Sequence, residues 1–306
     1  MSHASRANWL VFLALAGMWG SSYLFIKIGI ETFTPLTLVA GRLFFGLVLL
    51  VAAVAIARER LPREARIYRH LVVMAVLNIV IPFFLITWAE QTTSSALAAI
   101  LNATVPLFTI VFAASLLHDE PITVNRAVGL AIGFVGVVAI MSRNLVADDG
   151  NIAGEIALIG SSISYGIGNV YNRRNVRGLR PMIPALFQVG IAFVIVLVLA
   201  FVFERPLETQ LTRDGLFAIV WLGILGSGFA YLAYFRLIGD WGATRTSMVA
   251  YMLPIVGIGL GVVVLGETVD IRVLAGTALV IGGVALVNSR YGGRRLAGRS
   301  APIARP

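Results

Sequence analysis

Ten long apolar segments follow one another along almost the whole chain, and they leave little sequence for any other structure. A helix needs roughly 20 mostly apolar residues to cross a hydrocarbon layer of about 30 Å. The composition agrees, because 58% of the residues are hydrophobic and 13% are charged, against about 25% charged residues in a soluble domain. The sequence therefore predicts an all-α membrane protein with ten transmembrane helices, at residues 9–30, 34–57, 70–90, 94–117, 121–142, 152–172, 181–203, 215–238, 243–265 and 270–289.

The 24 basic residues are unevenly distributed between the loops on the two sides of such a bundle. With both termini on one side, eighteen fall on that side, five fall on the other, and Arg42 lies within a span. Because arginine-rich loops stay on the cytoplasmic side, both termini are predicted to be cytoplasmic. The net charge of +9 then indicates contact with membrane lipids and requires no nucleic-acid partner.

The two halves of the chain share one pattern when the sequence is shifted on itself by 146 to 148 residues. The matched residues are Trp19 and Tyr165, Lys27 and Arg173, Pro35 and Pro181, and Pro106 and Pro254. Each half holds five spans, an odd number, so the second half must be inserted upside down relative to the first. This predicts an inverted repeat of residues 1–146 and 147–290, a plan typical of secondary transporters. Residues 291–306 are predicted to be a disordered, basic cytoplasmic tail.

Four sequence motifs occur at matching places in this plan. They are WGSSYLFIK in the first span, AGRLFF around Arg42, and the paired segments PLFTIVFAASLLHDEPIT and PIVGIGLGVVVLGETVD. Together they resemble the EamA-type members of the drug/metabolite transporter superfamily, and the resemblance covers essentially the whole chain. It implies a carrier of ten helices in which helices 1–4 and 6–9 surround a central cavity, while helices 5 and 10 lie at the periphery. Within that family the overall similarity is to the YddG-like amino-acid exporters.

The first span carries a polar and aromatic face. Positions i, i+4 and i+8 lie on one side of a helix, which groups Trp19, Tyr23 and Lys27, with Ser22 beside them. Trp19 lies ten residues, or about 15 Å, beyond Trp9 and therefore near the membrane midplane, where interfacial anchoring does not explain it. Two interpretations stay open: a cavity wall, or a packed tryptophan whose N–H bonds a neighbouring helix.

Polar and aromatic side chains within the spans are the candidate substrate-binding residues. An unsatisfied amide in hydrocarbon is costly, so each needs a helix, water or a substrate as its partner. The candidates are Trp19, Ser22, Tyr23, Asn78, Asn102, Tyr165, Asn169, Gln188, Tyr231 and Tyr251. Hydrogen bonding between helices is the alternative role for the amides.

Charged residues near or within the spans are the candidates for gating or for a charged pathway: Lys27, Arg42, Glu90 and Arg173. Arg42 must face water or a partner group. It either holds an anionic group or a gating carboxylate, or it bonds carbonyls exposed at a broken helix. Lys27 lies close to the outer surface, where ordinary snorkelling explains it equally well. Glu267 precedes the last span, where it is predicted to stabilise the start of that helix.

Proline and glycine mark further places within the spans. Pro82, Pro106 and Pro254 are predicted helix hinges, with static kinks as the alternative. The pairs Gly129-x-x-x-Gly133 and Gly257-x-x-x-Gly261 allow helices to approach closely. They indicate packing within the chain, so the protein is expected to be a monomer or a weak homodimer.

Several function classes are disfavoured by what the sequence lacks. The single lysine follows Tyr-Leu-Phe-Ile and not a glycine, so there is no phosphate-binding loop for ATP. The three histidines, His3, His70 and His118, lie near the predicted cytoplasmic edge. We therefore expect no enzyme, no metal site and no cofactor. No acidic residue lies at the midplane, which favours facilitated diffusion, exchange or weak coupling over a buried proton relay.

The predicted function is that of a secondary transporter, an alternating-access carrier that exports small metabolites across the inner membrane. A lining rich in tryptophan, tyrosine and asparagine, with no midplane carboxylate, suits a neutral or aromatic amino acid as the small-molecule substrate. The alternatives are a carrier of purines, sugars or cationic drugs, and a channel. A channel is the weaker alternative, because a pore does not require an inverted repeat.

Overall fold

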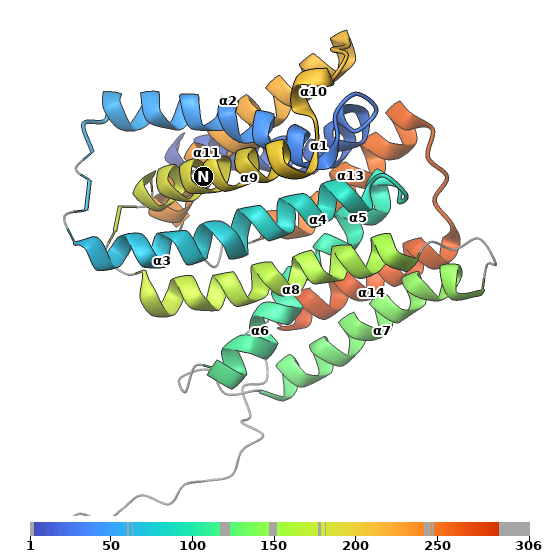
Figure 1. Ribbon diagram of the computed structural model, residues 1–306. Helices are drawn as coiled ribbons and strands as arrows, with labels where there is room; N and C mark the ends of the chain where they lie inside the picture. Colours follow the sequence, from blue (N-terminus) through green and yellow to red (C-terminus); the bar gives the residue numbers. More distant parts are fainter. Residues whose placement is uncertain are drawn as a thin grey trace, which may run out of the picture.

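The protein is a bundle of helices that lie side by side (Figure 1). The computed structural model describes residues 3–59, 61–62, 64–116, 123–146, 152–176, 179–180, 182–241, 246 and 248–287. The regular elements of these residues are all helices, which confirms the predicted helical class. The predicted tail, 291–306, lies outside the described residues.

The helices of the first half are α1 (His3–Gly29), α2 (Pro35–Ile56), α3 (Ala65–Ala75), α4 (Ile81–Ala89), α5 (Ser95–Asn102), α6 (Val105–Leu116) and α7 (Val124–Val146), with the π-helical segment η1 (Val76–Val80) between α3 and α4. Those of the second half are α8 (Ile152–Asn175), α9 (Met182–Phe203), η2 (Pro206–Glu208), α10 (Arg213–Gly223), the π-helical η3 (Ile224–Phe229), α11 (Ala230–Trp241), α13 (Val249–Leu265) and α14 (Ile271–Val287).

Among the described residues, seven helical stretches have the length and apolar composition needed to cross a membrane. They are Arg6–Gly29, Pro35–Ile56, Ala65–Ala89, Ser95–Leu116, Val124–Met141, Met182–Phe203 and Arg213–Trp241. Two further apolar helices, α13 and α14, are shorter. α8 is 24 residues long, with Glu155 in its first turn and Arg173 and Arg174 in its last turn, and it is not among the seven. Ten membrane-crossing helices therefore stay a prediction.

The two halves run in opposite directions through the bundle. α1 and its repeat mate α8 point opposite ways along the bundle axis (Figure 1), as an inverted repeat requires. α2 ends and α3 begins at the same end as the junction of α8 and α9. We call this the arginine-rich end, after Arg58, Arg66, Arg69, Arg173, Arg174 and Arg180. The opposite end is where α1, α4 and α13 end and where α2, α5 and α14 begin.

α7 and α14 form a pair at one side of the bundle (Figure 1). Glycines bring their backbones into contact: a Cβ on Gly283 would lie 2.5 Å from the Gly129 carbonyl oxygen and 2.6 Å from the Gly133 nitrogen. Gly276 packs in the same way against the Gly136 carbonyl, at 2.8 Å. The close approach allowed by Gly129 and Gly133 is thus used inside the chain.

The matched prolines of the two halves act differently. The helix breaks at Ala103 and Thr104, so the predicted span 94–117 is in fact two helices, α5 and α6. Pro106 lies directly after this break, where its missing N–H costs no helical hydrogen bond. Pro254 lies inside the continuous helix α13. Pro82 follows η1 at the start of α4, so two of the three predicted hinges sit at helix irregularities.

Candidate functional site

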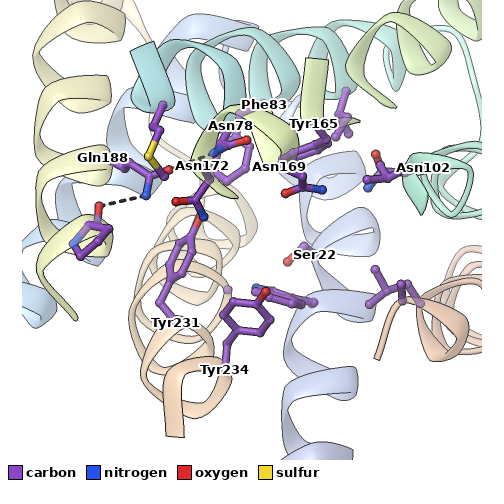
Figure 2. Close-up of a pocket in the computed structure, with 18 of the residues that line it drawn as sticks. Ser22, Asn78, Phe83, Asn102, Tyr165, Asn169, Asn172, Gln188, Tyr231 and Tyr234 are labelled. Carbon is purple, nitrogen blue, oxygen red and sulfur yellow. Dashed lines mark hydrogen bonds between the residues drawn. The ribbon is translucent and has the colours of Figure 1, made fainter. Parts of the chain in front are cut away.

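A cavity of about 420 Å³ lies between the two halves of the bundle. Nine of the ten predicted substrate-binding residues line it: Trp19, Ser22, Tyr23, Asn78 and Asn102 from the first half, and Tyr165, Asn169, Gln188 and Tyr231 from the second. Figure 2 shows Ser22, Asn78, Asn102, Tyr165, Asn169, Gln188 and Tyr231 arranged around one space, from helices that are far apart in the sequence. None of the described lining residues belongs to α7 or α14, in agreement with the expected peripheral place of helices 5 and 10.

Tyr251 is the one candidate that lies elsewhere. Its hydroxyl donates a 2.9 Å hydrogen bond to the carbonyl oxygen of Val284 in α14, because its position on α13 faces the α7–α14 pair and not the cavity. Tyr234, which the sequence also places in the lining beside Tyr231, does line the cavity. Asn172 lines it as well but was not predicted. It follows Asn169 by three positions, so helical spacing was the signal that could have identified it.

Arg42 is the one charged side chain among the described residues that line the cavity. It is 6% exposed, and its Nε donates a 2.9 Å hydrogen bond to Ser227 Oγ in η3. The guanidinium carbon lies 4.1 Å from the centre of the Phe83 ring, a favourable cation–π arrangement. Ser227 and Phe83 thus fix the orientation of the group. Within the described part of the chain, its two terminal nitrogens have no hydrogen-bond partner in the protein.

Tyr23 and Asn102 join α1 to α5 across the cavity. The Asn102 amide nitrogen donates a 2.7 Å hydrogen bond to the Tyr23 hydroxyl oxygen, and Ser161 Oγ lies 3.5 Å from the amide oxygen of Asn102. A tyrosine hydroxyl that accepts this bond still has its own proton to donate. This pair therefore places a hydroxyl donor at the cavity wall.

The other amides also bond between helices. Asn78 Nδ2 donates a 3.2 Å hydrogen bond to Gln188 Oε1 in α9. Within α9, Gln188 Nε2 donates to the Pro184 carbonyl at 3.0 Å, a bond that Figure 2 draws. Asn169 Nδ2 donates to Thr109 Oγ1 at 3.2 Å. Interhelical bonding, the alternative role for these amides, is therefore present, and the same side chains line the cavity.

The indole of Trp19 packs against two tyrosine rings of α11. Its ring centre lies 5.2 Å from that of Tyr234 and 6.3 Å from that of Tyr231, in tilted and edge-to-face arrangements. Such pairs stabilise by about 0.5–1.5 kcal/mol beyond burial. Trp19 is therefore part of a packed aromatic cluster that also forms a wall of the cavity.

Lys27 closes the bundle at the opposite end. Its ammonium donates hydrogen bonds of 2.5 Å and 2.8 Å to the main-chain carbonyls of Glu90 and Thr93, which follow the last residue of α4. A cation at a helix C-terminus is electrostatically favourable. Lys27 is not among the lining residues, so the structure shows a contact between α1 and α4 in place of simple snorkelling.

Two carboxylates bind the starts of helices in the other half at the same end. Glu204, after α9, accepts hydrogen bonds from the backbone N–H groups of Leu36 at 2.9 Å and Thr37 at 2.8 Å in α2. Glu267 accepts from the N–H groups of Ser95 at 2.7 Å and Ala96 at 3.0 Å in α5. Glu267 therefore caps α5, and the expectation that it stabilises the start of the last span is wrong. Negative charge at a helix start is favourable in either place.

The cavity lining extends further toward the arginine-rich end than toward the opposite end. It includes Asn172 and Val176 at the end of α8 and Pro184 at the start of α9. At the opposite end the last lining residues are Ile26 in α1 and Ile86 in α4. Ile26 directly precedes Lys27, whose ammonium joins α1 to the end of α4. Arg173 is exposed on α8 and does not line the cavity. At the arginine-rich end, Glu59 and Arg180 form an ion pair of 3.0 Å between the halves.

Comparison with known families gives one match that covers both halves. The EamA-like transporter family matches residues 7–142 and again residues 152–289. The two matched segments together span most of the chain and correspond to its two halves.

Named relatives of similar length agree with this. The chain is 30% identical over 258 residues to the "Uncharacterized inner membrane transporter YedA" of Escherichia coli (strain K12), which covers 84% of this chain and 82% of that protein. It is 23% identical over 288 residues to the "Uncharacterized transporter YoaV" of Bacillus subtilis (strain 168), with 94% and 98% covered. It is 23% identical over 294 residues to the "Probable amino-acid metabolite efflux pump" of Salmonella typhimurium, with 92% and 94% covered.

A solved crystal structure shares the fold. It matches with a TM-score of 0.65 at 20% sequence identity and covers 92% of this chain and 97% of that chain. At this identity the similarity concerns the arrangement of helices alone.

Proposed function

This chain belongs to the EamA-like transporter family, and from that premise we propose that it is a secondary transporter that carries neutral or aromatic amino acids through its central cavity. The observation that carries the proposal is a cavity between two inverted halves in which a buried arginine has unused donors. Ten membrane-crossing helices, cytoplasmic termini and export from the cell are parts of the same proposal.

The volume of the cavity supports a small cargo. Pockets that bind small molecules measure roughly 300–1,000 Å³, and this cavity of about 420 Å³ lies at the lower part of that range. An amino acid fits such a volume with room for water. Larger amphipathic drugs would need the cavity to expand.

The presence of Arg42 in the lining indicates that the cargo carries an anionic group. A guanidinium binds a carboxylate through two parallel hydrogen bonds, and such charge-assisted bonds are roughly twice as strong as neutral ones. Ser227 and Phe83 hold the guanidinium in place before the cargo arrives, so less side-chain freedom is lost on binding. The α-carboxylate of an amino acid supplies the matching group.

The remainder of the lining offers partners for an amino group and for an apolar or aromatic side chain on the cargo. Amide oxygens such as that of Asn102 accept hydrogen bonds from an ammonium, and the faces of Trp19 and Tyr231 attract a cation. The same aromatic rings, together with Leu253, offer apolar contact for a side chain. One site thus provides a partner for each part of a zwitterionic amino acid.

The two ends of the bundle support alternating access. At the opposite end, Lys27, Glu204 and Glu267 tie helix ends together across the bundle. At the arginine-rich end, the halves are joined by the ion pair of Glu59 and Arg180. A 2.7 Å hydrogen bond between His70 Nδ1 and the Tyr171 hydroxyl and the edge-to-face rings of Tyr68 and Phe187 also connect them there. In the proposed cycle, the contacts of Lys27, Glu204 and Glu267 break, and the two halves move closer together at the arginine-rich end.

Counterflow in proteoliposomes tests the proposal. Vesicles loaded with unlabelled phenylalanine should accumulate labelled phenylalanine transiently without ATP, and leucine should compete. The panel includes a purine, a sugar and a cationic drug. Saturable counterflow of the purine, sugar or drug with none of the amino acids contradicts the proposed cargo. Solute movement that never saturates contradicts the carrier and supports a channel.

A further inference from the structure

The buried carboxyl group of Glu90 has no part in the scheme above. Glu90 lies directly after α4 at the opposite end, and it is 0% exposed. Within the part of the chain that the structure describes, neither of its two carboxylate oxygens has a hydrogen-bond partner. The Oγ of Ser95, at the start of the next helix, is also fully buried without a partner. Most buried polar atoms have at least one partner, so each exception requires a reason.

Lys27 lies close to Glu90 but does not pair with this carboxylate. Its ammonium donates to the main-chain carbonyls of Glu90 and Thr93, which have to be satisfied at the end of α4. The carboxylate oxygens stay without a hydrogen bond. The lysine therefore acts as a cap of α4 and leaves the Glu90 side chain uncompensated by any direct bond.

Other ionisable groups surround the Glu90 carboxyl at longer range. Lys27 in α1 and Arg42 in α2 favour its charged form, Glu267 after α13 opposes it, and burial opposes it most strongly. The Tyr23 hydroxyl in α1 is also within electrostatic range. Burial is the largest of these influences, and it favours the protonated form.

α8 adds a further acid at the same end. Gly154 packs against the Ala89 carbonyl, where a Cβ would lie 3.2 Å from the oxygen. The next residue, Glu155, is 1% exposed. α8 therefore helps to cover this corner of the bundle.

An ionised carboxylate held away from water without a hydrogen bond costs several kcal/mol, and such a group takes up a proton instead. Water that enters from the opposite end would remove this cost. We propose that the Glu90 carboxyl is a proton-binding site, which holds a proton while the opposite end is closed and releases it to water when that end opens. On opening, the O–H bond of the carboxyl breaks, water takes the proton, and the carboxylate becomes hydrated.

The direction of the pH effect follows from this linkage. The closed state binds one proton more than the open state, so acid stabilises closure and alkali favours opening. Between the ordinary pKa of a glutamate, about 4.3, and the higher value of the closed state, the ratio of open to closed protein rises by up to about tenfold per pH unit. The proposal rests on the proposed function only in assuming that the opposite end opens.

Thiol labelling measures this opening without reference to cargo. The chain contains no cysteine, so Thr93→Cys introduces a single thiol at a position that is 7% exposed in the closed state. Thr92→Cys, at the exposed neighbouring position, corrects for the intrinsic effect of pH on a thiol. The ratio of the two maleimide labelling rates in detergent should rise with pH, by up to about tenfold per unit, from the ordinary pKa of a glutamate, about 4.3, upward.

Substitutions then assign the effect to Glu90. In Glu90→Gln, the ratio of the Thr93→Cys and Thr92→Cys labelling rates should change by less than about twofold over the pH range studied. The reason is that one titrating group accounts for the dependence of this ratio on pH. Glu31→Gln, at an exposed acid beyond α1 on the same end, should keep the full slope, and so should Glu90→Asp. A flat ratio in the parent chain overturns the proposal, and so does an unchanged slope in Glu90→Gln.

Two further outcomes separate this proposal from the proposed cargo. If amino-acid counterflow fails while the labelling slope is present and requires Glu90, the cargo is wrong and the proton site stands. If the slope depends on sodium concentration at constant pH, the ligand of Glu90 is a metal cation and the proton assignment is wrong. Where Glu90→Gln does not fold, the slope in the parent chain and in Glu90→Asp still decides.

Discussion

Arg42 and Ser227, which are 185 residues apart, are joined by a 2.9 Å hydrogen bond in the buried centre of the bundle. The bond links α2 of the first half to the π-helical segment η3 of the second. The repeat mate of η3 is η1, which carries Asn78, and both segments line the cavity. π-Helical turns within α-helices are frequent at functional sites. Arg42 is therefore held by the π-helical segment η3 of the second half, and the first half has the matching segment η1.

Replacing Arg42 should abolish tight binding of the cargo. We expect Arg42→Gln to raise the half-saturation concentration for phenylalanine counterflow by about 30-fold or more, because a charge-assisted pair contributes about 2 kcal/mol. Arg42→Lys should recover little, since an ammonium lacks the planar fork. Thermal unfolding in detergent serves as the control for folding. Normal half-saturation in Arg42→Gln would falsify the assignment.

Ser227 should act through the orientation of Arg42. Ser227→Ala removes the hydroxyl that accepts the hydrogen bond from Arg42 Nε. It should raise the half-saturation concentration by several-fold and change the maximal rate less. A hydrogen bond to a charged group contributes about 1.5–3 kcal/mol, and water replaces part of it. Ser115→Ala is the matched control: Ser115 is exposed and bonds only the Val111 carbonyl of its own helix. Equal effects of the two substitutions would remove the role of Ser227.

Trp19 should matter most for aromatic cargo. Trp19→Ala removes a ring of the cavity wall that contacts the aromatic side chain of the cargo in the proposed site. We expect about a fivefold loss in affinity for phenylalanine, because one aromatic pair contributes roughly 1 kcal/mol. Alanine as cargo should be affected less. Trp88→Ala, at a 39% exposed position on α4, provides the control. A loss that is identical for both cargoes would indicate a structural role of Trp19 alone.

Two neighbouring glycines of α14 should respond differently to the same change. A Cβ on Gly283 meets α7 backbone atoms at 2.5 Å and 2.6 Å, whereas a Cβ on Gly282 meets nothing within 4 Å. Gly283→Ala should therefore destabilise by about 1–3 kcal/mol through overpacking, and Gly282→Ala should leave the melting temperature in detergent unchanged. Equal melting temperatures for the two variants would show that α7 and α14 do not pack as described.

Cysteine accessibility should distinguish the two ends of the cavity. Val176→Cys lies in the lining at the arginine-rich end, and Gln91→Cys lies exposed at the opposite end. In inside-out membrane vesicles, an impermeant maleimide should label Val176→Cys, and saturating phenylalanine should slow that labelling. In intact cells it should label Gln91→Cys. The reverse pattern would contradict the proposed orientation, which derives from the distribution of arginine.

The sequence predicted most of the cavity because its signals are local or repeated. Helical spacing grouped Trp19 with Tyr23, and the internal repeat placed Tyr165 and Asn169 in the matching face of the other half. Both signals depend only on the geometry of a helix and on the inverted plan. The same spacing, applied once more, would have included Asn172.

Contacts between distant helix ends were not predictable in this way. Glu267 caps a helix that begins 172 residues earlier, while its sequence neighbours pointed to the helix that follows it. Gly266, with a φ of 66°, turns the chain at this point, and glycine adopts that left-handed conformation without strain. Whether an acid at a span end reaches its own helix or another one depends on packing that sequence spacing does not contain.

The sequence also did not predict which residues at the ends of the spans are buried. Hydropathy placed Glu90 at the edge of a span, where an acid is normally hydrated, yet it is 0% exposed. Lys27 of α1 bonds its carbonyl, and Gly154 of α8 packs against the neighbouring Ala89 carbonyl. Tyr251 shows the same limit, because the rotation of α13 about its axis decides whether a side chain faces the cavity or α14. Tertiary contacts fix that rotation.

Competition between phenylalanine and phenylalaninamide tests the central claim most directly. The two compounds share ring and amino group, and they differ in the carboxylate assigned to Arg42. In counterflow with labelled phenylalanine, unlabelled phenylalanine should compete at least about 30-fold more strongly than the amide, and this preference should disappear in Arg42→Gln. Equal competition by the two compounds in the parent chain would contradict the claim that Arg42 binds the carboxylate of the cargo.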